Sequence, residues 1–301
     1  MANVLSRGNL FPPHLTNELF NLVKGKSSLA ILSQQSPIPF NGTTLFTFNL
    51  DNEVDVVAEN DPKSNGGGTM GSKNIVPIKI EYGMRVSDEF MYASEEYQLS
   101  VLQAFADGFA TKAAKGLDLM ALHGFNPRTM SKSVNVIGNN NFDDLVSQTV
   151  PSTASANANM ESAVALVQGS DYEVTGAIIS PTFKASLARE TYATDGRPMF
   201  PELSWGGSPQ TLNGLRVDFN ATVSAHAAGG SAADHVVLGN FRDYFRWGVA
   251  KDVGIEVIEY GNPDNDAKAG DLKGHNQIYL RGEMYVGWGI LFPNAFARIT
   301  P

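Results

Sequence analysis

The sequence predicts an α+β fold, and three observations lead to that class. In residues 76–86 apolar and polar side chains alternate, which is typical of a half-buried strand. In residues 94–123 apolar residues recur at spacings of three and four, which is typical of an amphipathic helix. Between residues 174 and 238 short apolar segments alternate with helical ones, which indicates a compact α/β module.

The composition favours a folded chain whose main function is not nucleic-acid binding. The 301 residues are 43% hydrophobic and 18% charged, enough for one or two domains and incompatible with wholesale disorder. The 22 basic and 31 acidic residues give a net charge of −9, whereas binding to a phosphate backbone depends on clustered Lys and Arg. No apolar run approaches the ~18 residues that span a bilayer, and no signal peptide is evident. We therefore expect a soluble protein made in the cytoplasm.

The first 40 residues do not resemble the start of a compact domain. Pro12 and Pro13 precede a short amphipathic segment, Leu15–Val23, and a run rich in Ser, Gln and Pro continues to Pro39. The periodicity leaves two alternatives open. The segment is either a helix packed on its own domain or an arm that lies on a neighbouring subunit.

Residues 46–86 are predicted to contain two strands of an antiparallel ribbon. Side chains alternate with a period of two in residues 46–50 and again in residues 76–86. The connection between them, residues 51–75, is polar and far longer than the ~2–5 residues of ordinary hairpin loops. A segment with so few apolar anchors is either disordered or ordered by a partner, and the regular strands on both sides favour contact with a partner.

A single long helix is expected over residues 94–123. Ser94 supplies an N-cap oxygen, and the two glutamates that follow face the positive end of the helix dipole. Gly124 and Pro127 end the helix. Its length would be roughly 45 Å. A helix of this length with one apolar stripe is expected to form a rigid spine laid against a sheet.

The second half of the chain is expected to form a compact module and then two long strands. Residues 131–158 are predicted to be a linker, and residues 225–233 a flexible loop, because small and polar residues dominate both. The elements expected between and after them are helices over 160–168 and 181–189 and strands over 174–180, 212–219, 235–238, 254–260 and 277–290. The last two strands flank a polar tip, residues 261–275.

Motifs for nucleotide binding are incomplete. Gly66 and Gly71 have the spacing of a P-loop, but Ser72 stands where the lysine is needed and a strand follows in place of a helix. A second triplet, 25–27, has the right order of residues, but Phe20 replaces the first glycine. The sequence therefore argues against a phosphate cradle.

Metal sites are not indicated either. The chain has no cysteine, which excludes disulfides, Cys-ligated zinc, iron–sulfur clusters and thiol nucleophiles and fits a reducing compartment. Asp264, Asp266 and Asp271 resemble a calcium loop but lack its spacing and closing glutamate, so a solvated acidic tip is the better interpretation. No pair of histidines has the spacing of metal ligands among His14, His123, His226, His235 and His275.

Hydrolase motifs are equally incomplete. Residues 230–233 lack the last glycine of a nucleophile elbow. Glu95 and Glu96 are adjacent and diverge on a helix, so they cannot act as a facing carboxylate pair. Residues 195–198 form only a turn signature. The sequence therefore predicts no catalytic, cofactor-binding or metal-ligating residue, no cofactor and no enzymatic activity.

Six weak motifs occur in order along the chain. They are Val86–Phe90 with Asp118–Gly124, Ile179–Thr182 continuing to Thr194–Phe200, Leu212–Val217, Leu238–Tyr244, Leu280–Gly287 and Pro293–Ala297. Together they cover about residues 46–301 and resemble the major capsid proteins of tailed bacteriophages with the HK97 fold. One departure is Asn240, where the family usually has an acidic residue.

The resemblance implies an HK97-like organisation. Its parts are expected as an N-terminal arm (1–40), an extended β-ribbon loop with flanking strands (41–86), a peripheral domain with the spine helix (87–144), an axial α/β domain (145–250), the β-hairpin of the peripheral domain (251–289) and a C-terminal segment returning to the axial domain (290–301). The loop at 195–209 would point to the centre of the capsomer. The tip at 261–275 would meet neighbouring capsomers at local three-fold axes.

The implied function is structural. Copies of the chain would assemble into pentamers and hexamers that form the icosahedral or prolate shell of the virion around phage DNA, in the cytoplasm of a bacterial host. The implied partners are other copies, a portal protein at one vertex and packaged DNA bound without sequence specificity; a decoration protein is left open, and no membrane is involved. Because the arm-like sequence starts at Met1, we expect a separate scaffolding protein or none.

Three further questions stay open at this point. Lys63 and Lys73 lie in the loop from which some family members cross-link a lysine to an asparagine of a neighbour, but no motif identifies the partners, so that chemistry is not carried over. An encapsulin-like shell of a cellular compartment shares the fold and is an alternative. A soluble enzyme with an unrecognised site is a second alternative of a different class.

Overall fold

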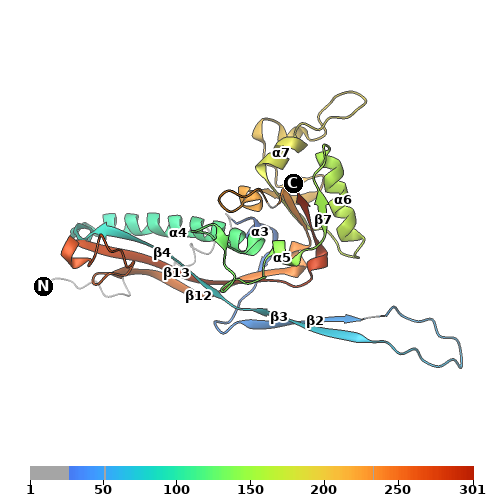
Figure 1. The fold of residues 1–301 in the computed structure, drawn as a ribbon, viewed down its shortest axis with the longest axis horizontal. Coiled ribbons are helices and arrows are strands. Elements are labelled where there is room, and N and C mark those ends of the chain that lie inside the picture. Colours follow the sequence, from blue (N-terminus) through green and yellow to red (C-terminus); the bar gives the residue numbers. More distant parts are fainter. Residues whose placement is uncertain (1–26, 51, 233) are drawn as a thin grey trace.

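A computed structural model of the chain describes residues 27–50, 52–232 and 234–301. It contains two main sheets, a long helix and a projecting two-stranded ribbon (Figure 1). The amphipathic segment expected at Leu15–Val23 lies outside the described residues. In the described part of the chain, no helix combines the length and the apolar composition that crossing a membrane requires.

The first sheet has four strands in the order β1 (Gln34–Gln35), β12 (Phe245–Ile258), β13 (Gln277–Ile290) and β4 (Ile78–Ser87). Strand β13 is antiparallel to both of its neighbours. The strand expected over 277–290 is confirmed, because its apolar side chains alternate toward the core. Strand β12 begins at Phe245, nine residues earlier than the expected start at 254.

Helix α4 (Glu95–His123) lies along this sheet (Figure 1). Ser94 caps its start by accepting a hydrogen bond from the N–H of Tyr97, and Gly124 ends it in the left-handed conformation with φ of 69°. The helix approaches β13 closely at Gly282, because a Cβ on that glycine would lie 3.1 Å from the ring of Phe109. The expected spine helix is therefore confirmed, together with its packing on a sheet.

The second sheet has six strands in the order β7 (Thr149–Pro151), β14 (Phe296–Thr300), β11 (Val236–Gly239), β8 (Gly176–Ile179), β10 (Leu215–Phe219) and β9 (Thr211–Leu212). Helices α6 (Ala156–Gln168) and α7 (Pro181–Leu187) pack on it with a separate apolar core. Strands β8 and β11 are buried along their whole length, which explains why their sequences are continuous apolar runs. The α/β module expected between 174 and 238 is thus present, and the last strand of the chain, β14, completes it.

The ribbon differs from its prediction. Strand β2 (Thr43–Leu50) pairs antiparallel with β3 (Gly68–Ile75), not with the strand expected at 76–86. That strand, β4, pairs instead with β13. Residues 68–75 were expected to be loop because they are polar, but backbone pairing in an exposed two-stranded ribbon does not require apolar alternation. The irregular connection within 51–75 is therefore shorter than expected, at residues 52–67.

The segment expected as a linker, residues 131–158, contains short elements. Among them are β6 (Ser131–Lys132) and α5 (Phe142–Leu145). The short elements elsewhere in the described chain are α3 (Ser28–Leu32), η1 (Asp88–Tyr92), β5 (Phe125–Asn126), η2 (Pro201–Gly206), η3 (Ala221–Ser224), α8 (Phe241–Tyr244), η4 (Lys273–His275) and η5 (Pro293–Ala295). Asn141 caps the start of helix α5, which buries Phe142. An asparagine in this polar segment therefore acts as a helix N-cap and not only as a loop residue.

Candidate functional site

The ribbon carries an exposed apolar face. Phe46, Phe48 and Leu50 share one face of β2 because side chains alternate along a strand. Met70 lies directly across from Phe48 in the register of the two strands. Phe46 and Met70 are each 76% exposed, and Phe48 is 62% exposed. Large apolar side chains held in water in this number mark a surface that another molecule covers.

Among the described residues, the ribbon is attached to the body at its base. Ile75 is buried and packs over Gly287 and Gly289 of β13, which have no side chains to block it. Beyond this point the two strands project away from both sheets (Figure 1). An isolated two-stranded hairpin is only marginally stable in water. The other described residues therefore give the ribbon little support beyond its base.

The connection at the end of the ribbon is acidic and exposed. Residues 52–67 carry Glu53, Asp55, Glu59 and Asp61, and all of them face solvent. Lys63 is exposed as well. Lys73 lies at the base of the ribbon, where burial lowers its pKa. The two loop lysines thus occupy different environments.

Arg85 organises the polar tip between β12 and β13. Its Nε donates to Oδ2 of Asp264 at 2.8 Å, and its Nη2 donates to Oδ1 of Asn262 at 2.8 Å. It also donates to the carbonyls of Ala269 and Gly270 at 3.2 and 3.0 Å. The hydrogen bond from Arg85 lowers the pKa of Asp264 to about 2. The guanidinium of Arg85 thus pairs with the carboxylate of Asp264 and with two carbonyl oxygens of the tip.

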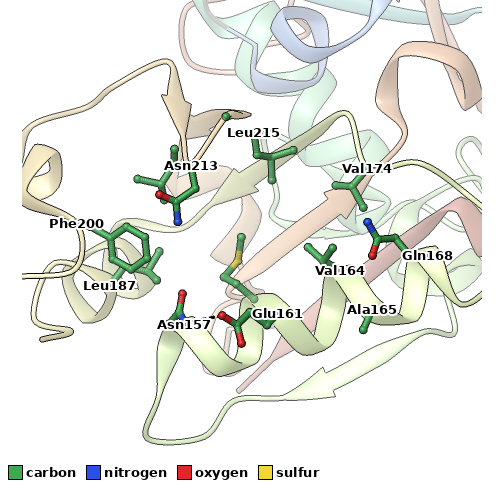
Figure 2. A pocket seen from close by; sticks show the side chains of 13 residues that line it. Asn157, Glu161, Val164, Ala165, Gln168, Val174, Leu187, Phe200, Asn213 and Leu215 are labelled. Atoms are coloured by element: carbon green, nitrogen blue, oxygen red, sulfur yellow. Dashed lines mark hydrogen bonds between the residues drawn. The ribbon is translucent and has the colours of Figure 1, made fainter. Parts of the chain in front are cut away.

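An open hollow of about 510 Å³ lies between α6 and the turn that joins β9 to β10 (Figure 2). The side chains that face it are mostly apolar, and Glu161 is the single ionisable group among them. Glu161 accepts a hydrogen bond from Asn157 at 2.8 Å. The hollow therefore offers no converging pair for acid–base chemistry. Its lining is Asn157, Met160, Glu161, Val164, Ala165, Gln168, Val174, Leu187, Phe200, Leu212, Asn213, Gly214 and Leu215.

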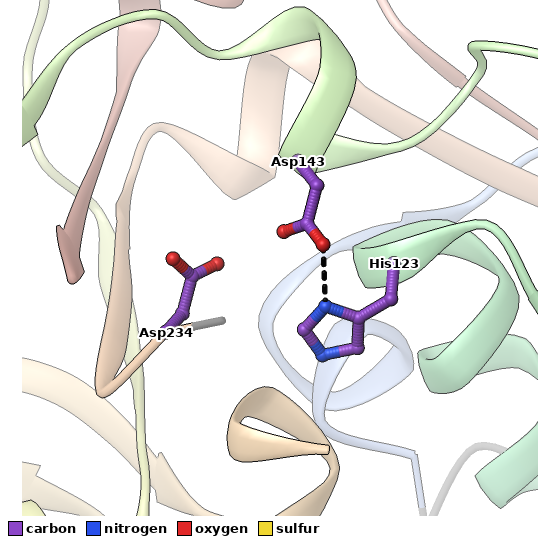
Figure 3. Close-up of side chains that lie close together, drawn as sticks. All are labelled: His123, Asp143 and Asp234. Carbon is purple, nitrogen blue, oxygen red and sulfur yellow. Dashed lines mark hydrogen bonds and ion pairs between the residues drawn. The ribbon is translucent and has the colours of Figure 1, made fainter. Parts of the chain in front are cut away.

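A buried charged cluster lies where α4 ends (Figure 3). Nδ1 of His123 is 2.9 Å from Oδ2 of Asp143 on α5, and Nε2 is 2.9 Å from the carbonyl oxygen of Thr222. Arg298 on β14 donates from Nη1 to Asp143 at 2.9 Å and to Asp234 at 3.1 Å. The histidine and the two carboxylates lie close enough together to suggest a metal site. The guanidinium of Arg298 already donates to an oxygen of each carboxylate.

A second buried cluster surrounds Asp118 on the apolar face of α4, near the C-terminal end of the helix. Its Oδ1 accepts from Oγ of Ser27 at 2.5 Å and from the N–H of Leu29 at 3.3 Å. Its Oδ2 accepts from the N–H of Ser28 at 3.0 Å and from Nδ2 of Asn220 at 3.2 Å. Burial raises the pKa of Asp118 to about 6 even with these donors around it. The carboxylate ties the start of the described chain to the long helix.

Neither cluster was predicted from the sequence. Asp118 stands in an otherwise apolar run, 117–122, and a charge in such a run signals a buried polar contact. His123 was considered only as a candidate metal ligand. No pattern in the sequence around Arg298 indicates its buried contacts, because its partners lie 155 and 64 residues away.

The family of the chain follows from comparison with known proteins. The sequence model that describes the phage capsid family matches residues 7–300, nearly the whole chain. The chain belongs to the phage capsid family. A comparison with curated proteins returned no match.

Solved structures agree with membership of the phage capsid family. A structure from Mycobacterium phage Ogopogo is 29% identical, with a TM-score of 0.77 and coverage of 91% of this chain and 92% of that chain. A structure from Gordonia phage Cozz is 21% identical, with a TM-score of 0.74 and coverage of 91% and 86%. The capsid of an empty GTA particle, 14% identical with a TM-score of 0.63, covers 100% of this chain and 94% of its own. The expected HK97-like fold is thereby confirmed.

Membership of the phage capsid family defines the function. The chain is a structural protein of the virion shell, and copies of it associate with one another to build that shell. The encapsulin-like alternative is not favoured, because the matched family and the similar structures are of phage and capsid origin. The functional sites of such a protein are the surfaces through which copies meet.

Proposed function

We propose that copies of the chain assemble into pentamers and hexamers, which tile an icosahedral or prolate shell around phage DNA. The apolar face of the ribbon is the observation that supports this proposal. Covering one exposed Phe side chain contributes roughly 1.5–3 kcal/mol. Phe46, Phe48, Leu50 and Met70 together therefore contribute a large part of the energy of one contact between copies.

The proposal assigns a role to each projecting part. The ribbon and the tip at 261–275 lie on neighbouring copies, whereas α3 and β1 within the predicted arm (1–40) pack on their own chain. Residues 145–250 form the axial domain, whose loop at 195–209 faces the centre of the ring. Cyclic symmetry repeats each contact around the ring. The other domain boundaries are proposed as predicted from the sequence, but β4 and the start of β12 belong to the four-stranded sheet of the peripheral domain.

Partners other than copies of the chain complete the proposal. Assembly takes place in the bacterial cytoplasm, with a separate scaffolding protein and with a portal protein at one vertex. The net charge of −9 suits an inner wall that repels DNA weakly and lets it slide during packaging. Purified capsomers should accordingly bind DNA weakly, and tight, salt-sensitive binding would contradict this role.

The test replaces the apolar face of the ribbon. The double variant Phe46→Asp/Phe48→Asp should abolish assembly, because the charges cannot be buried against a neighbour without partners. Thr47→Asp is the matched control, since Thr47 lies between them on the opposite face of the same strand. Sedimentation velocity and negative-stain microscopy measure assembly, and thermal unfolding of the subunits verifies that both variants fold.

Two outcomes would be informative. Loss of shells in the double variant, with shells retained in the control, supports the proposal. Normal shells from the double variant would show that the apolar face is not an assembly contact.

A further inference from the structure

The protonation of His123, in the buried cluster at the end of α4, follows from the atoms that its ring nitrogens contact. Nε2 of His123 lies 2.9 Å from the carbonyl oxygen of Thr222. A carbonyl can only accept, so Nε2 must carry a proton. Nδ1 lies 2.9 Å from Oδ2 of Asp143, so one further proton lies between these two atoms.

That second proton belongs to the histidine. The other oxygen of Asp143 accepts from Nη1 of Arg298 at 2.9 Å, which favours the ionised carboxylate. His123 is therefore an imidazolium that donates from both ring nitrogens. The ring is fully buried and stacks on Phe125 with a centroid separation of 5.4 Å, so water does not replace either partner.

Charged groups approach the histidine from three elements. Asp143 comes from α5, Asp234 precedes β11 and Arg298 lies on β14. Asp144, the neighbour of Asp143, is directed to Lys132 at 2.5 Å. The group of His123, Asp143, Asp234 and Arg298, which we call the charge lock, has two positive and two negative members and is neutral when all four are ionised.

The charge lock joins two parts of the fold. His123 is the last residue of α4, the helix that packs on the four-stranded sheet, whereas Arg298 is in the middle of β14 in the six-stranded sheet. We propose that the charge lock is a proton-dependent clamp that holds the end of α4 to the six-stranded sheet only while His123 carries both of its ring protons. This device is independent of the assembly contacts proposed above.

Loss of one proton opens the clamp. A neutral His123 keeps the hydrogen bond to Thr222 but can no longer donate to Asp143. The remaining three groups then carry a net negative charge in a buried site, which is unfavourable. Burial lowers the pKa of His123, but the hydrogen bond and the charge of Asp143 and the hydrogen bond to Thr222 raise it above its ordinary value. The clamp therefore opens as the pH rises through the raised pKa of His123.

Asp234 responds to acidification, whereas His123 responds to a rise in pH. Burial raises the pKa of Asp234 and the charge of Arg298 opposes this rise. Asp234 accordingly takes up a proton on mild acidification. The charge of Asp143 also raises the pKa of Asp234, so protonation of Asp234 relieves the repulsion between the two carboxylates and leaves the contact between His123 and Asp143 closed.

The protonation of His123 can be measured directly. The full chain is labelled with ¹⁵N-histidine, and magic-angle-spinning NMR of its sedimented assemblies is recorded at pH 7.5. We expect one of the five histidines to have two protonated ring nitrogens. Single His→Gln variants of the other four histidines, His14, His226, His235 and His275, assign it to His123 by elimination. A neutral His123 at pH 7.5 would overturn the proposal.

Two variants test the clamp itself. Asp143→Asn removes the carboxylate, so burial should dominate and His123 should become neutral at pH 7.5. Hydrogen exchange followed by mass spectrometry measures opening of residues 119–126 and 296–301. In the unmodified chain, exchange corrected for its intrinsic pH dependence should rise at least several-fold between pH 6.5 and 9.

The matched control keeps the result specific. His226→Gln changes an exposed histidine and should leave this rise intact. His123→Gln should exchange fast at both pH values. Exchange in the unmodified chain that does not change with pH would show that the contact is structural and not proton-dependent.

Discussion

The backbone N–H of Ser28 donates to the carboxylate of Asp118 at 3.0 Å, although 90 residues separate them. The contact fixes the first turn of α3 against the C-terminal part of α4. The carboxylate holds α3 to the long helix together with the buried side chains of Leu29 and Leu32.

Replacing Asp118 should destabilise the subunit strongly. Asp118→Ala leaves the N–H groups of Ser28 and Leu29 and the hydroxyl of Ser27 buried without their acceptor. We expect a loss of about 2–4 kcal/mol in the free energy of unfolding. Urea unfolding of unassembled subunits measures it. The control Asp107→Ala lies on the exposed side of the same helix and should change stability by less than about 0.5 kcal/mol. Equal effects of the two variants would contradict the assignment.

Stability should fall as the pH rises from about 4.5 to about 8. Burial raises the pKa of Asp118 to about 6 and that of Asp234 to about 7, so the folded state holds these protons more tightly than the unfolded state does. Above the unfolded pKa each ionisation therefore costs stability, on the order of 1 kcal/mol for every tenfold difference in proton affinity between the folded and unfolded states. The raised pKa of His123 acts in the same direction.

The midpoint of urea unfolding at several pH values tests this dependence. Asp264 acts oppositely, because its pKa is lowered to about 2, but only at pH values below about 4. Asp118→Asn should flatten the profile between about pH 4 and 6. A midpoint that rises steadily from about pH 5 to 8 would be incompatible with the buried acids described above.

Substitutions at two glycines should change the stability of the subunit in opposite directions. Gly282 faces the ring of Phe109, and an added Cβ would lie 3.1 Å from it, so Gly282→Val should cost about 1–3 kcal/mol. Gly108 lies within α4 with open space around it, so Gly108→Ala should stabilise by about 0.5–1 kcal/mol. Thermal unfolding of both variants measures the difference. Stabilisation by Gly282→Val would show that α4 does not press on β13.

Arg85 should control the order of the tip at 261–275. Arg85→Ala removes the donors that hold Asn262, Asp264 and the carbonyls of Ala269 and Gly270. Hydrogen exchange in the tip should accelerate several-fold, whereas exchange in β13 should change little. Arg85→Lys keeps the charge without the planar fork and should give an intermediate rate. Unchanged exchange in Arg85→Ala would mean that the tip is ordered by its own backbone.

Trp205 should report on the proposed ring contact. It is fully exposed and held at a φ of 57°, whereas Trp247 and Trp288 are buried. If the loop at 195–209 faces the centre of the capsomer, the tryptophan fluorescence emission should shift to shorter wavelength on assembly. Quenching of this fluorescence by acrylamide should fall. Trp205→Phe should remove both changes without preventing folding. An emission spectrum that is identical in subunits and shells would place the loop away from other copies.

The sequence predicted the elements whose signal is local. The stripe in 94–123, with Ser94 and Gly124 at its ends, identified the spine helix, and the alternation in 277–290 identified β13. Both patterns reflect which face of one element is buried, and that is recorded in the order of residues. The six motifs, taken in their order along the chain, also indicated the family.

Only the tertiary structure decided which segments meet. Strand β3 pairs with β2 although its residues 68–75 are polar, and β4 pairs with β13, almost two hundred positions later. The same holds for Asp118 with Ser28 and for Asp143 with Arg298, because a buried charge is stable only beside partners that the folded chain brings to it. Strand pairing and burial of charge depend on contacts across the whole chain, and no local window of sequence contains them.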